Sequence, residues 1–379
     1  MEIKNYCATK YILGSGSLET LSQYKGKKVA LVVDENIIRA LNLEQRLYQE
    51  ILAGVDYRVI CSITHEPTMA ELEAPIRTVQ EYQPDYIVGI GGGSVMDSAK
   101  VLWLFYELPH YDWARAMVPY GVDPFPGKAQ MIAVPTTSGT GSETTCCAMV
   151  KDSENLKKMI LSFEVVPTVA IMDFDLLKSL PPRNVAYSGT DALAHALGAA
   201  VSKPASGLVR AVALQASVML VKNLPASAVG NQDAREAVHI AATLAGQAIN
   251  NSMTGLEHAM AKAGEVFNLP HGLVSGLMLP YVMRWQIPNP VYAELASQLE
   301  IPGTGEARQF ALVDAIWDMY DKIGMPRTLR EAGVDEQTYL HNLPVHLAAM
   351  RTEFGLETGP KRPDEADLET LFRQFYYGI

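Results

Sequence analysis

Two polar residues in the second half of the chain have types and a spacing that suit metal binding. Asp191 and His195 interrupt the small, apolar stretch SGTDALAHALGAAVSK (188–203). Their separation of four places a carboxylate and an imidazole on one face of a helix, one turn apart. A structural hydrogen bond between the two side chains also explains the pair, so further ligands are needed to favour a metal site.

Two more histidines supply those candidate ligands. In the apolar segment GLEHAMAKAGEVFNLPHGLVSG (255–276), His258 is expected on a helix, and His271 follows Pro270 where another helix opens. A cation shared by one carboxylate and three imidazoles offsets the free-energy cost of burying these polar groups. Because all the ligands are nitrogen or oxygen, Fe²⁺ and Zn²⁺ both fit, and intrinsic affinity favours zinc.

A glycine-rich loop in the first half has the composition of a phosphate site. The apolar run YIVGI (86–90) leads into Gly91, Gly92, Gly93 and Ser94, which open a predicted helix. Glycines let the backbone approach a ligand closely, and a helix N-terminus offers unpaired N–H groups and a positive dipole end to a diphosphate. The alternative is a plain tight turn.

Two further features of the first half suit a nucleotide. The loop PTTSGTGSETT (135–145) follows another apolar strand, at the sheet edge where open α/β sheets bind ligands, although it also fits a Ser/Thr-rich turn with helix capping. Asp34 ends the strand KVALVV, where a carboxylate can bind a ribose hydroxyl and repel a 2′-phosphate. This favours NAD over NADP; an N-cap role is equally compatible with the sequence.

The elements that must position these residues differ between the two halves. Continuously apolar runs alternate with amphipathic segments up to about residue 175, which predicts a parallel sheet buried on both faces. The predicted strands are 28–33, 57–63, 86–90, 131–135 and 168–173. After SLPPRN (179–184), Ala- and Leu-rich stretches predict helices only.

These patterns predict two domains. An α/β dinucleotide-binding domain with a parallel sheet is expected over residues 1–180, and an all-α metal-binding domain over 181–379, with the ligand in the cleft between them. A chain of 379 residues exceeds the size at which a single hydrophobic core stops growing.

Composition narrows the classes of partner and compartment. The chain has 31 Lys and Arg against 42 Asp and Glu, a net charge of −11, and no basic run, which argues against nucleic-acid binding. It contains no uncharged apolar stretch of 18 residues and no signal-like start, so no membrane association is expected and a cytoplasmic location is predicted. The four cysteines, Cys7 included, show no CxxC spacing and are expected to be reduced.

Four motifs in sequence order resemble the iron-dependent alcohol dehydrogenase family. They are GGGSVMDSAK, PTTSGTGSE, SGTDALAHALGAAVS and HAMAK…FNLPHG, which together span residues 91 to 272. The resemblance implies iron as the metal, NAD or NADP as the cofactor, and Asp191, His195, His258 and His271 as the metal ligands. It also implies a set of cofactor contacts: Asp34, Gly92, Gly93, Ser94, Asp97, Thr136, Thr137, Thr145 and Lys158.

The chain departs from the family pattern beside His258. Family members usually carry another His four residues later, near the nicotinamide, and here that position is Lys262. The segment between His258 and His271 is also one residue shorter than the common pattern, although NLPHG is intact. Lys262 is either an ordinary solvated lysine or a catalytic-site residue that faces the cleft and binds a carboxylate-bearing substrate.

The resemblance implies transfer of hydride between a small primary alcohol, diol or hydroxyacid and the nicotinamide, with the metal as Lewis acid. A homo-oligomer, a dimer or larger, is also expected from it. Two alternatives remain at this point. One is a related metal- and NAD-dependent enzyme of the dehydroquinate synthase or glycerol dehydrogenase kind, and the other is a non-catalytic nucleotide-binding protein.

Overall fold

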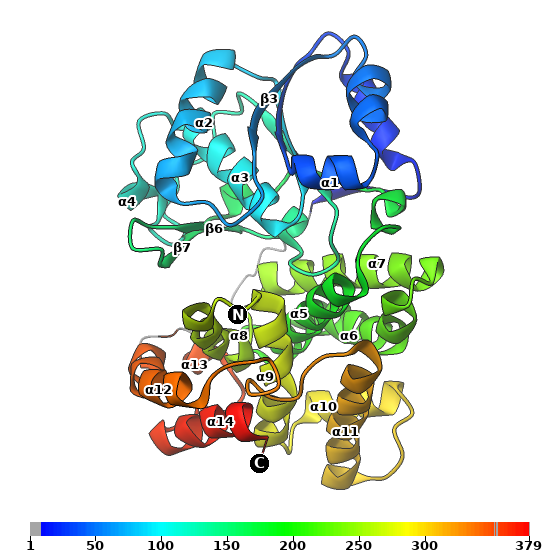
Figure 1. Ribbon diagram of the computed structural model, residues 1–379, viewed down its shortest axis with the longest axis vertical. Coiled ribbons are helices and arrows are strands. Elements are labelled where there is room, and N and C mark those ends of the chain that lie inside the picture. The colour runs from blue at the N-terminus through cyan, green and yellow to red at the C-terminus, as the bar shows by residue number, and fades with distance from the viewer. Residues whose placement is uncertain (1–8, 352, 354, 379) are drawn as a thin grey trace. The chain divides into compact units, whose positions relative to one another are not determined.

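The computed structural model describes residues 9–351, 353 and 355–378, and the chain divides into two compact units (Figure 1). Unit 1 comprises the described residues up to Thr137 together with Gly141–Ser179. Unit 2 comprises Ser138–Thr140 and the described residues from Leu180 onward. Cys7 lies outside the described residues, and the other three cysteines form no disulfide with one another.

Unit 1 is built on a six-stranded sheet in the order β1-β8-β5-β4-β2-β3, and every pairing is parallel. Its strands are β1 (Lys10–Leu13), β2 (Lys28–Val33), β3 (Asp56–Ser62), β4 (Tyr86–Gly91), β5 (Gln130–Pro135) and β8 (Val169–Met172). Its α-helices are α1 (Glu35–Ala40), α2 (Met69–Tyr82), α3 (Gly93–Glu107) and α4 (Trp113–Ala116).

The apolar strands are explained by burial on both faces of this sheet. Along β2, Val29, Leu31 and Val33 pack in one hydrophobic cluster, whereas Ala30 and Val32 pack in another. Successive side chains of a strand point to opposite faces, so neither face can be polar. The predicted α/β class and parallel sheet are therefore correct.

The structure adds strands to the five that were predicted. β1 lies at the sheet edge, and its outer residues are exposed. β6 (Cys147–Lys151) and β7 (Lys157–Leu161) form a separate antiparallel hairpin with three lysines among its partly exposed residues. Edge and hairpin strands of this kind lack the continuous apolar run by which buried parallel strands are recognised.

The described residues of unit 2 contain helices and no strand, as predicted. The helices are α5 (Pro182–Val201), α6 (Gly207–Ala228), α7 (Gln232–Asn250), α8 (Leu256–Ala261), α9 (His271–Gln286), α10 (Pro290–Gln298), α11 (Gly305–Ile323), α12 (Glu336–Met350), α13 (Gly355–Thr358) and α14 (Glu365–Tyr377). Pro182 opens α5, since a proline at the first helical position loses no hydrogen bond.

Helix α5 lies at the centre of unit 2, packed against α6, α7 and α9. Every residue from Gly189 to Val201 is buried. Among the described helices, α6 is long and apolar enough to meet the length and composition criteria for a membrane span. It contributes Leu214, Leu220 and Leu224 to the hydrophobic core of the unit, and core helices meet the same criteria.

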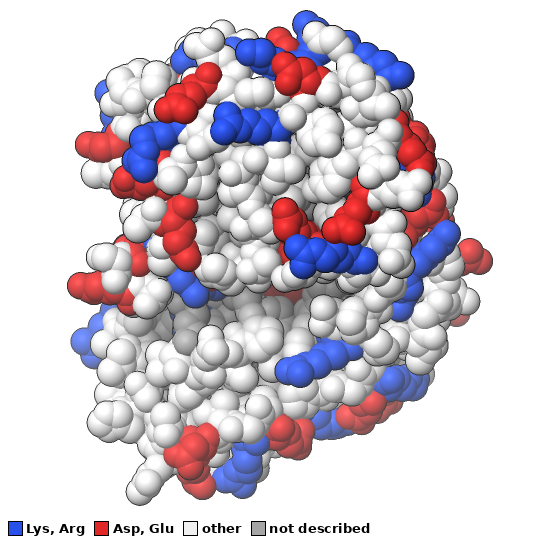
Figure 2. All heavy atoms as spheres, turned by 45° about the horizontal axis from the view of Figure 1, so that its top comes forward, with Lys and Arg blue, Asp and Glu red and all other residues white. Residues whose placement is uncertain are grey.

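The surface carries charges of both signs. On the face shown in Figure 2, Lys and Arg side chains are interspersed with Asp and Glu, and the described residues drawn there form no continuous basic stripe.

Candidate metal centre and cofactor-binding loops

Three of the predicted metal ligands form a buried cluster in unit 2. Asp191 and His195 lie one turn apart on α5, and His258 comes from α8. The distance from His195 Nδ1 to Asp191 Oδ2 is 3.9 Å, and that from His258 Nε2 to Asp191 Oδ1 is 3.4 Å. One ligand atom from each residue lies within 4.8 Å of the other two, a spacing that a single ion can bridge.

The fourth predicted ligand, His271, lies beside this cluster. It is the first residue of α9, and its Nε2 is 3.9 Å from Asp191 Oδ1. Its ring centroid is 5.6 Å from that of His258. Its side chain is 40% exposed, so His271 lies at the solvent edge of the group, while the other three side chains are buried.

The side chains present fit a divalent cation. His195 Nδ1 and His258 Nε2 are both buried, and neither has a hydrogen-bond partner among the described residues. Buried polar atoms normally have such partners, and a metal ion would satisfy both. The Asp191 carboxylate is also held in place by a neighbouring side chain. Ser275 Oγ donates a 2.6 Å hydrogen bond to Asp191 Oδ1 and thereby orients that carboxylate.

The electrostatics of the cluster favour the protonation states that metal binding needs. Burial raises the pKa of Asp191, but the neighbouring His195, His258 and His271 outweigh it and hold that pKa well below its usual value. Burial and the other two histidines lower the pKa of His195 to about 3. Asp191 is therefore an anion and His195 a neutral imidazole at neutral pH.

His258 differs from His195 in its protonation. Burial lowers its pKa, but the nearby carboxylates of Asp191 and Glu257 outweigh that effect and raise the pKa to about 9. In the metal-free protein this imidazole is therefore cationic at neutral pH. A divalent cation would replace its proton, because a metal ligand must offer a free lone pair.

In unit 1, the glycine loop joins β4 to the buried helix α3. Gly92 is the N-cap of α3, and no side chain caps this helix end. A Cβ at Gly91 would come within 2.4 Å of the Val95 side chain, so the turn requires glycine there. The resulting helix N-terminus presents the backbone N–H groups of Gly93 and Ser94, the arrangement that binds phosphates.

The second predicted loop begins beside this helix end. The backbone N–H of Thr136 donates to Gly91 O at 3.0 Å, and Thr137 Oγ1 lies 3.6 Å from where a Gly92 Cβ would stand. Thr136 Oγ1 is buried and has no hydrogen-bond partner among the described residues. A buried hydroxyl at the carboxyl edge of a parallel sheet is available to a bound nucleotide.

Asp34 serves as the helix cap that the sequence offered as an alternative to ribose binding. Its Oδ1 accepts hydrogen bonds from Asn36 N at 2.9 Å and Ile37 N at 3.3 Å at the start of α1. Both hydrogen bonds use the same oxygen. The capping role therefore leaves Oδ2 able to accept a bond from a ribose hydroxyl.

Three other predicted cofactor contacts are engaged within unit 1. Asp97 accepts hydrogen bonds from Ser142 Oγ at 2.6 Å and Met149 N at 2.9 Å. Thr145 accepts two from the Lys100 ammonium, and Lys158 Nζ lies 3.1 Å from Asp152 Oδ2. These contacts place Asp97 and Thr145 in a network that holds the loop, and Lys158 on the β7 hairpin.

Lys100 at the centre of that network was missed by the sequence reasoning. It is fully buried on α3, and its Nζ lies 2.8–3.1 Å from Ser142 Oγ, Thr145 O, Thr145 Oγ1 and Cys147 O. The available signal was its spacing of three from Asp97 on the helix that follows the glycines, which puts both on one face.

Lys262, the predicted catalytic residue, follows α8 directly and forms an ion pair with Glu353. The Lys262 side chain is 55% exposed, and that of Glu353 is mostly buried. An anionic substrate would therefore have to share Lys262 with this carboxylate.

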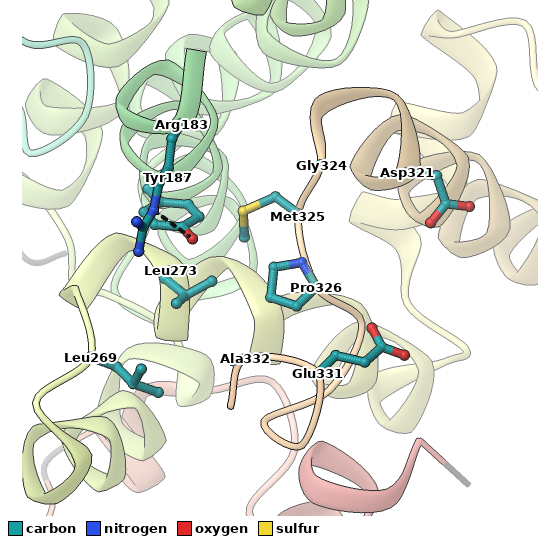
Figure 3. Close-up of a pocket in the computed structure, with 10 residues that line it drawn as sticks. All are labelled: Arg183, Tyr187, Leu269, Leu273, Asp321, Gly324, Met325, Pro326, Glu331 and Ala332. Carbon is teal, nitrogen blue, oxygen red and sulfur yellow. Dashed lines mark hydrogen bonds between the residues drawn. The ribbon is translucent and has the colours of Figure 1, made fainter. Parts of the chain in front are cut away.

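A separate cavity of about 500 Å³ opens on unit 2 (Figure 3). Arg183 and Tyr187 of α5 and Leu273 of α9 line part of its wall, and Arg183 Nε donates to Tyr187 Oη at 3.1 Å. None of the four predicted metal ligands lines it, although Leu269 and Leu273 flank His271 in the sequence. The metal centre is thus distinct from this cavity.

Comparison with known proteins identifies the family. The model of the iron-containing alcohol dehydrogenase family matches residues 8–174, and the model of the C-terminal domain of the Fe-containing alcohol dehydrogenase family matches residues 185–376. The chain belongs to the iron-containing alcohol dehydrogenase family. It is an oxidoreductase of the metal-dependent alcohol dehydrogenase class, which uses a divalent metal and a nicotinamide cofactor.

Individual relatives agree with this placement. The chain is 32% identical to an NADPH-dependent butanol dehydrogenase of Clostridium saccharobutylicum, and the match covers 96% of each protein. It is 31% identical to an aldehyde-alcohol dehydrogenase of Streptococcus pneumoniae, of which it spans 44%. An iron-containing alcohol dehydrogenase structure from Thermococcus thioreducens matches with a TM-score of 0.87 and 31% identity, over 98% of this chain and 99% of that one.

Proposed function

We propose that this protein is an NAD-dependent alcohol dehydrogenase or aldehyde reductase for a small primary alcohol, diol or hydroxyacid. The observation that carries the proposal is the buried cluster of Asp191, His195 and His258. In this cluster two buried imidazole nitrogens without hydrogen-bond partners among the described residues face one carboxylate. His271 completes the proposed ligand set, and iron is the proposed metal because the family is iron-containing.

When bound, the divalent cation supplies Lewis-acid activation of the alcohol or carbonyl oxygen, and the nicotinamide accepts or donates hydride. The residues of the chain bind and orient these groups. Ser275 fixes the Asp191 carboxylate, and burial of the three innermost ligands excludes water, which strengthens the electrostatic interactions there.

The proposed cofactor contacts fall into two groups, one for the diphosphate of the nucleotide and one for its ribose. The N–H groups of Gly93 and Ser94, after Gly92, bind the diphosphate, and Thr136 and Thr137 flank it. Asp34 accepts from the ribose, and its negative charge disfavours a 2′-phosphate. We retain NAD as the preferred cofactor, although one relative is named an NADPH-dependent enzyme, and the assay below includes both.

Substrate size is proposed from the names of relatives. Besides the butanol dehydrogenase, they include a 1-propanol dehydrogenase of Citrobacter freundii at 29% identity and a 1,3-propanediol oxidoreductase structure at 28% identity and a TM-score of 0.89. We also propose that residues 1–180 and 181–379 are the cofactor-binding and metal-binding domains. A cytoplasmic homo-oligomer completes the proposal.

The test combines elemental analysis of anaerobically purified protein with assays of NADH and NADPH oxidation across a panel of short aldehydes. The expected result is one iron or zinc ion per chain and net oxidation of NADH with a three- or four-carbon aldehyde. A metal-containing protein that binds NAD yet gives no net turnover would indicate a lyase or cyclase that uses NAD transiently. Metal-free protein that is blind to both cofactors would reject the proposal.

A further inference from the structure

The two ring nitrogens of His258 face two different carboxylates. Nε2 is directed into the metal cluster, 3.4 Å from Asp191 Oδ1. Nδ1 lies on the other side of the ring, 3.2 Å from Oε1 of Glu257. The Glu257 carboxyl group is therefore placed to accept a hydrogen bond from Nδ1, and this contact leaves Nε2 as the nitrogen that faces the proposed metal position.

Glu257 itself is buried in a space that two glycines provide. Glu257 is only 2% exposed to solvent. A Cβ on Gly198 would lie 2.6 Å from Glu257 Oε1, and one on Gly255 would lie 2.3 Å from Oε2. Gly198 is on α5, three residues after His195, so the helix that carries two proposed ligands also makes room for this carboxylate.

Burying a carboxylate is costly unless a partner compensates. The His258 imidazole is the partner that the structure gives Glu257. By contrast, the backbone of Gly139 hydrogen-bonds to His195, and a neutral hydroxyl, Ser275 Oγ, holds Asp191. Glu257 thus brings a second carboxyl group, besides that of Asp191, into contact with the His258 imidazole.

We propose that Glu257 is a positioning residue that holds His258 with Nε2 toward the metal and thereby raises the affinity of the site for a divalent cation. The inference rests on the proposed metal centre and deepens it. A carboxylate behind a ligating imidazole fixes the ring orientation and tautomer and makes the nitrogen a stronger donor.

The test measures metal binding rather than turnover. Zn²⁺ affinity is determined by competition with a chelator for the full-length protein and for two variants. Glu257→Leu removes both the charge and the acceptor, and we expect its Kd for Zn²⁺ to rise roughly 10- to 100-fold. Glu257→Gln keeps an acceptor oxygen in the same place without the charge, so a smaller rise of at least about threefold is expected. Glu294→Gln on α10 serves as the matched control.

A second readout separates positioning from general structural damage. With Co²⁺ in place of Zn²⁺, the visible ligand-field spectrum of Glu257→Leu should differ from that of the wild type, whereas NAD affinity should change less than twofold. Zn²⁺ affinities within twofold of wild type in both variants would overturn the inference. If Glu257→Leu fails to fold, an unchanged affinity in Glu257→Gln has the same force. A wild-type protein that binds no Zn²⁺ would instead count against the proposed function.

Discussion

At the scale of single residues, one side chain can serve both as a helix cap and as a cofactor contact. Asp34 was compatible with either a ribose contact or a helix cap, and the structure uses only Oδ1 for the cap. The negative charge beside the end of β2 remains, and it is this charge that matters for a cofactor phosphate. Capping and cofactor choice can therefore be separated by substitution.

Asp34→Ser keeps a capping oxygen while removing the charge. We expect the ratio of kcat/KM for NADP to that for NAD to rise by tenfold or more, because repulsion of the 2′-phosphate is lost. Steady-state kinetics with both cofactors provides the measurement. Asp34→Ala is the control for the cap, with an expected loss of about 1 kcal/mol of unfolding free energy. A ratio that stays within twofold of wild type would remove Asp34 from cofactor selection.

Lys262 can be tested in a similar way. If it binds an anionic substrate, Lys262→Ala should raise KM for a semialdehyde acid about tenfold, as expected for loss of a charge-assisted hydrogen bond of about 1.5 kcal/mol. KM for a neutral aldehyde of the same length should change little. Glu353→Gln removes the competing carboxylate and should lower KM for the acid. Equal effects of Lys262→Ala on both aldehydes would leave Lys262 as a solvated lysine.

At the scale of elements, α3 does two things. Its N-terminus follows the glycine loop, and its buried Asp97 and Lys100 hold the loop and strand from Ser142 to Met149. Burial raises the pKa of Asp97, and the ammonium of Lys100 opposes that rise. Both proposed cofactor loops are thus anchored to one helix.

Lys100→Met should loosen the second loop, because Ser142, Thr145 and Cys147 lose the ammonium group that they contact. Each buried acceptor left without a donor costs about 1 to 3 kcal/mol, a loss that urea unfolding would detect. We also expect the Kd for NAD, measured by fluorescence titration of folded protein, to rise at least tenfold. Unchanged NAD affinity in a destabilised variant would confine Lys100 to a purely structural role.

The sequence predicted those strands and helices whose own residues carry a recognisable apolar or helical pattern. β2, β4 and β5 lie within one residue of the predicted runs because they are apolar at successive positions. The grouping of Asp191 and His195 followed from helical spacing alone. Lys100 and Glu257 were not predicted, since a lysine or glutamate is usually exposed, and their burial depends on partners distant in sequence or on glycines elsewhere.

At the scale of the whole molecule, each unit has hydrophobic clusters of its own. Those of unit 1 combine residues of the sheet with residues of its helices, and those of unit 2 come mainly from helices. The proposed cofactor contacts belong to unit 1, and the proposed metal ligands belong to unit 2. The proposed reaction needs both, but binding of each group depends on side chains from one unit.

We therefore expect His258→Ala and His271→Ala to abolish turnover while NAD affinity stays within a few-fold of wild type. Activity assays after metal reloading and NAD titration give the two measurements. The reciprocal control is Gly91→Val, which forces a side chain against Val95 and should weaken NAD binding with little effect on Zn²⁺ affinity. Near-normal activity of either histidine variant after chelation would contradict the ligand assignment.

The separate cores have a consequence for how such an enzyme can diversify. A substitution at the end of β2 that alters nucleotide preference would change the packing free energy of the hydrophobic core of unit 1. A substitution near α5 or α8 that alters metal binding would change that of unit 2. Stability effects at distant sites with no shared partners are close to additive. A loss of stability caused by a change in cofactor preference therefore does not require a stabilising substitution in the metal-binding unit. Cofactor preference and metal can thus change in either order during evolution.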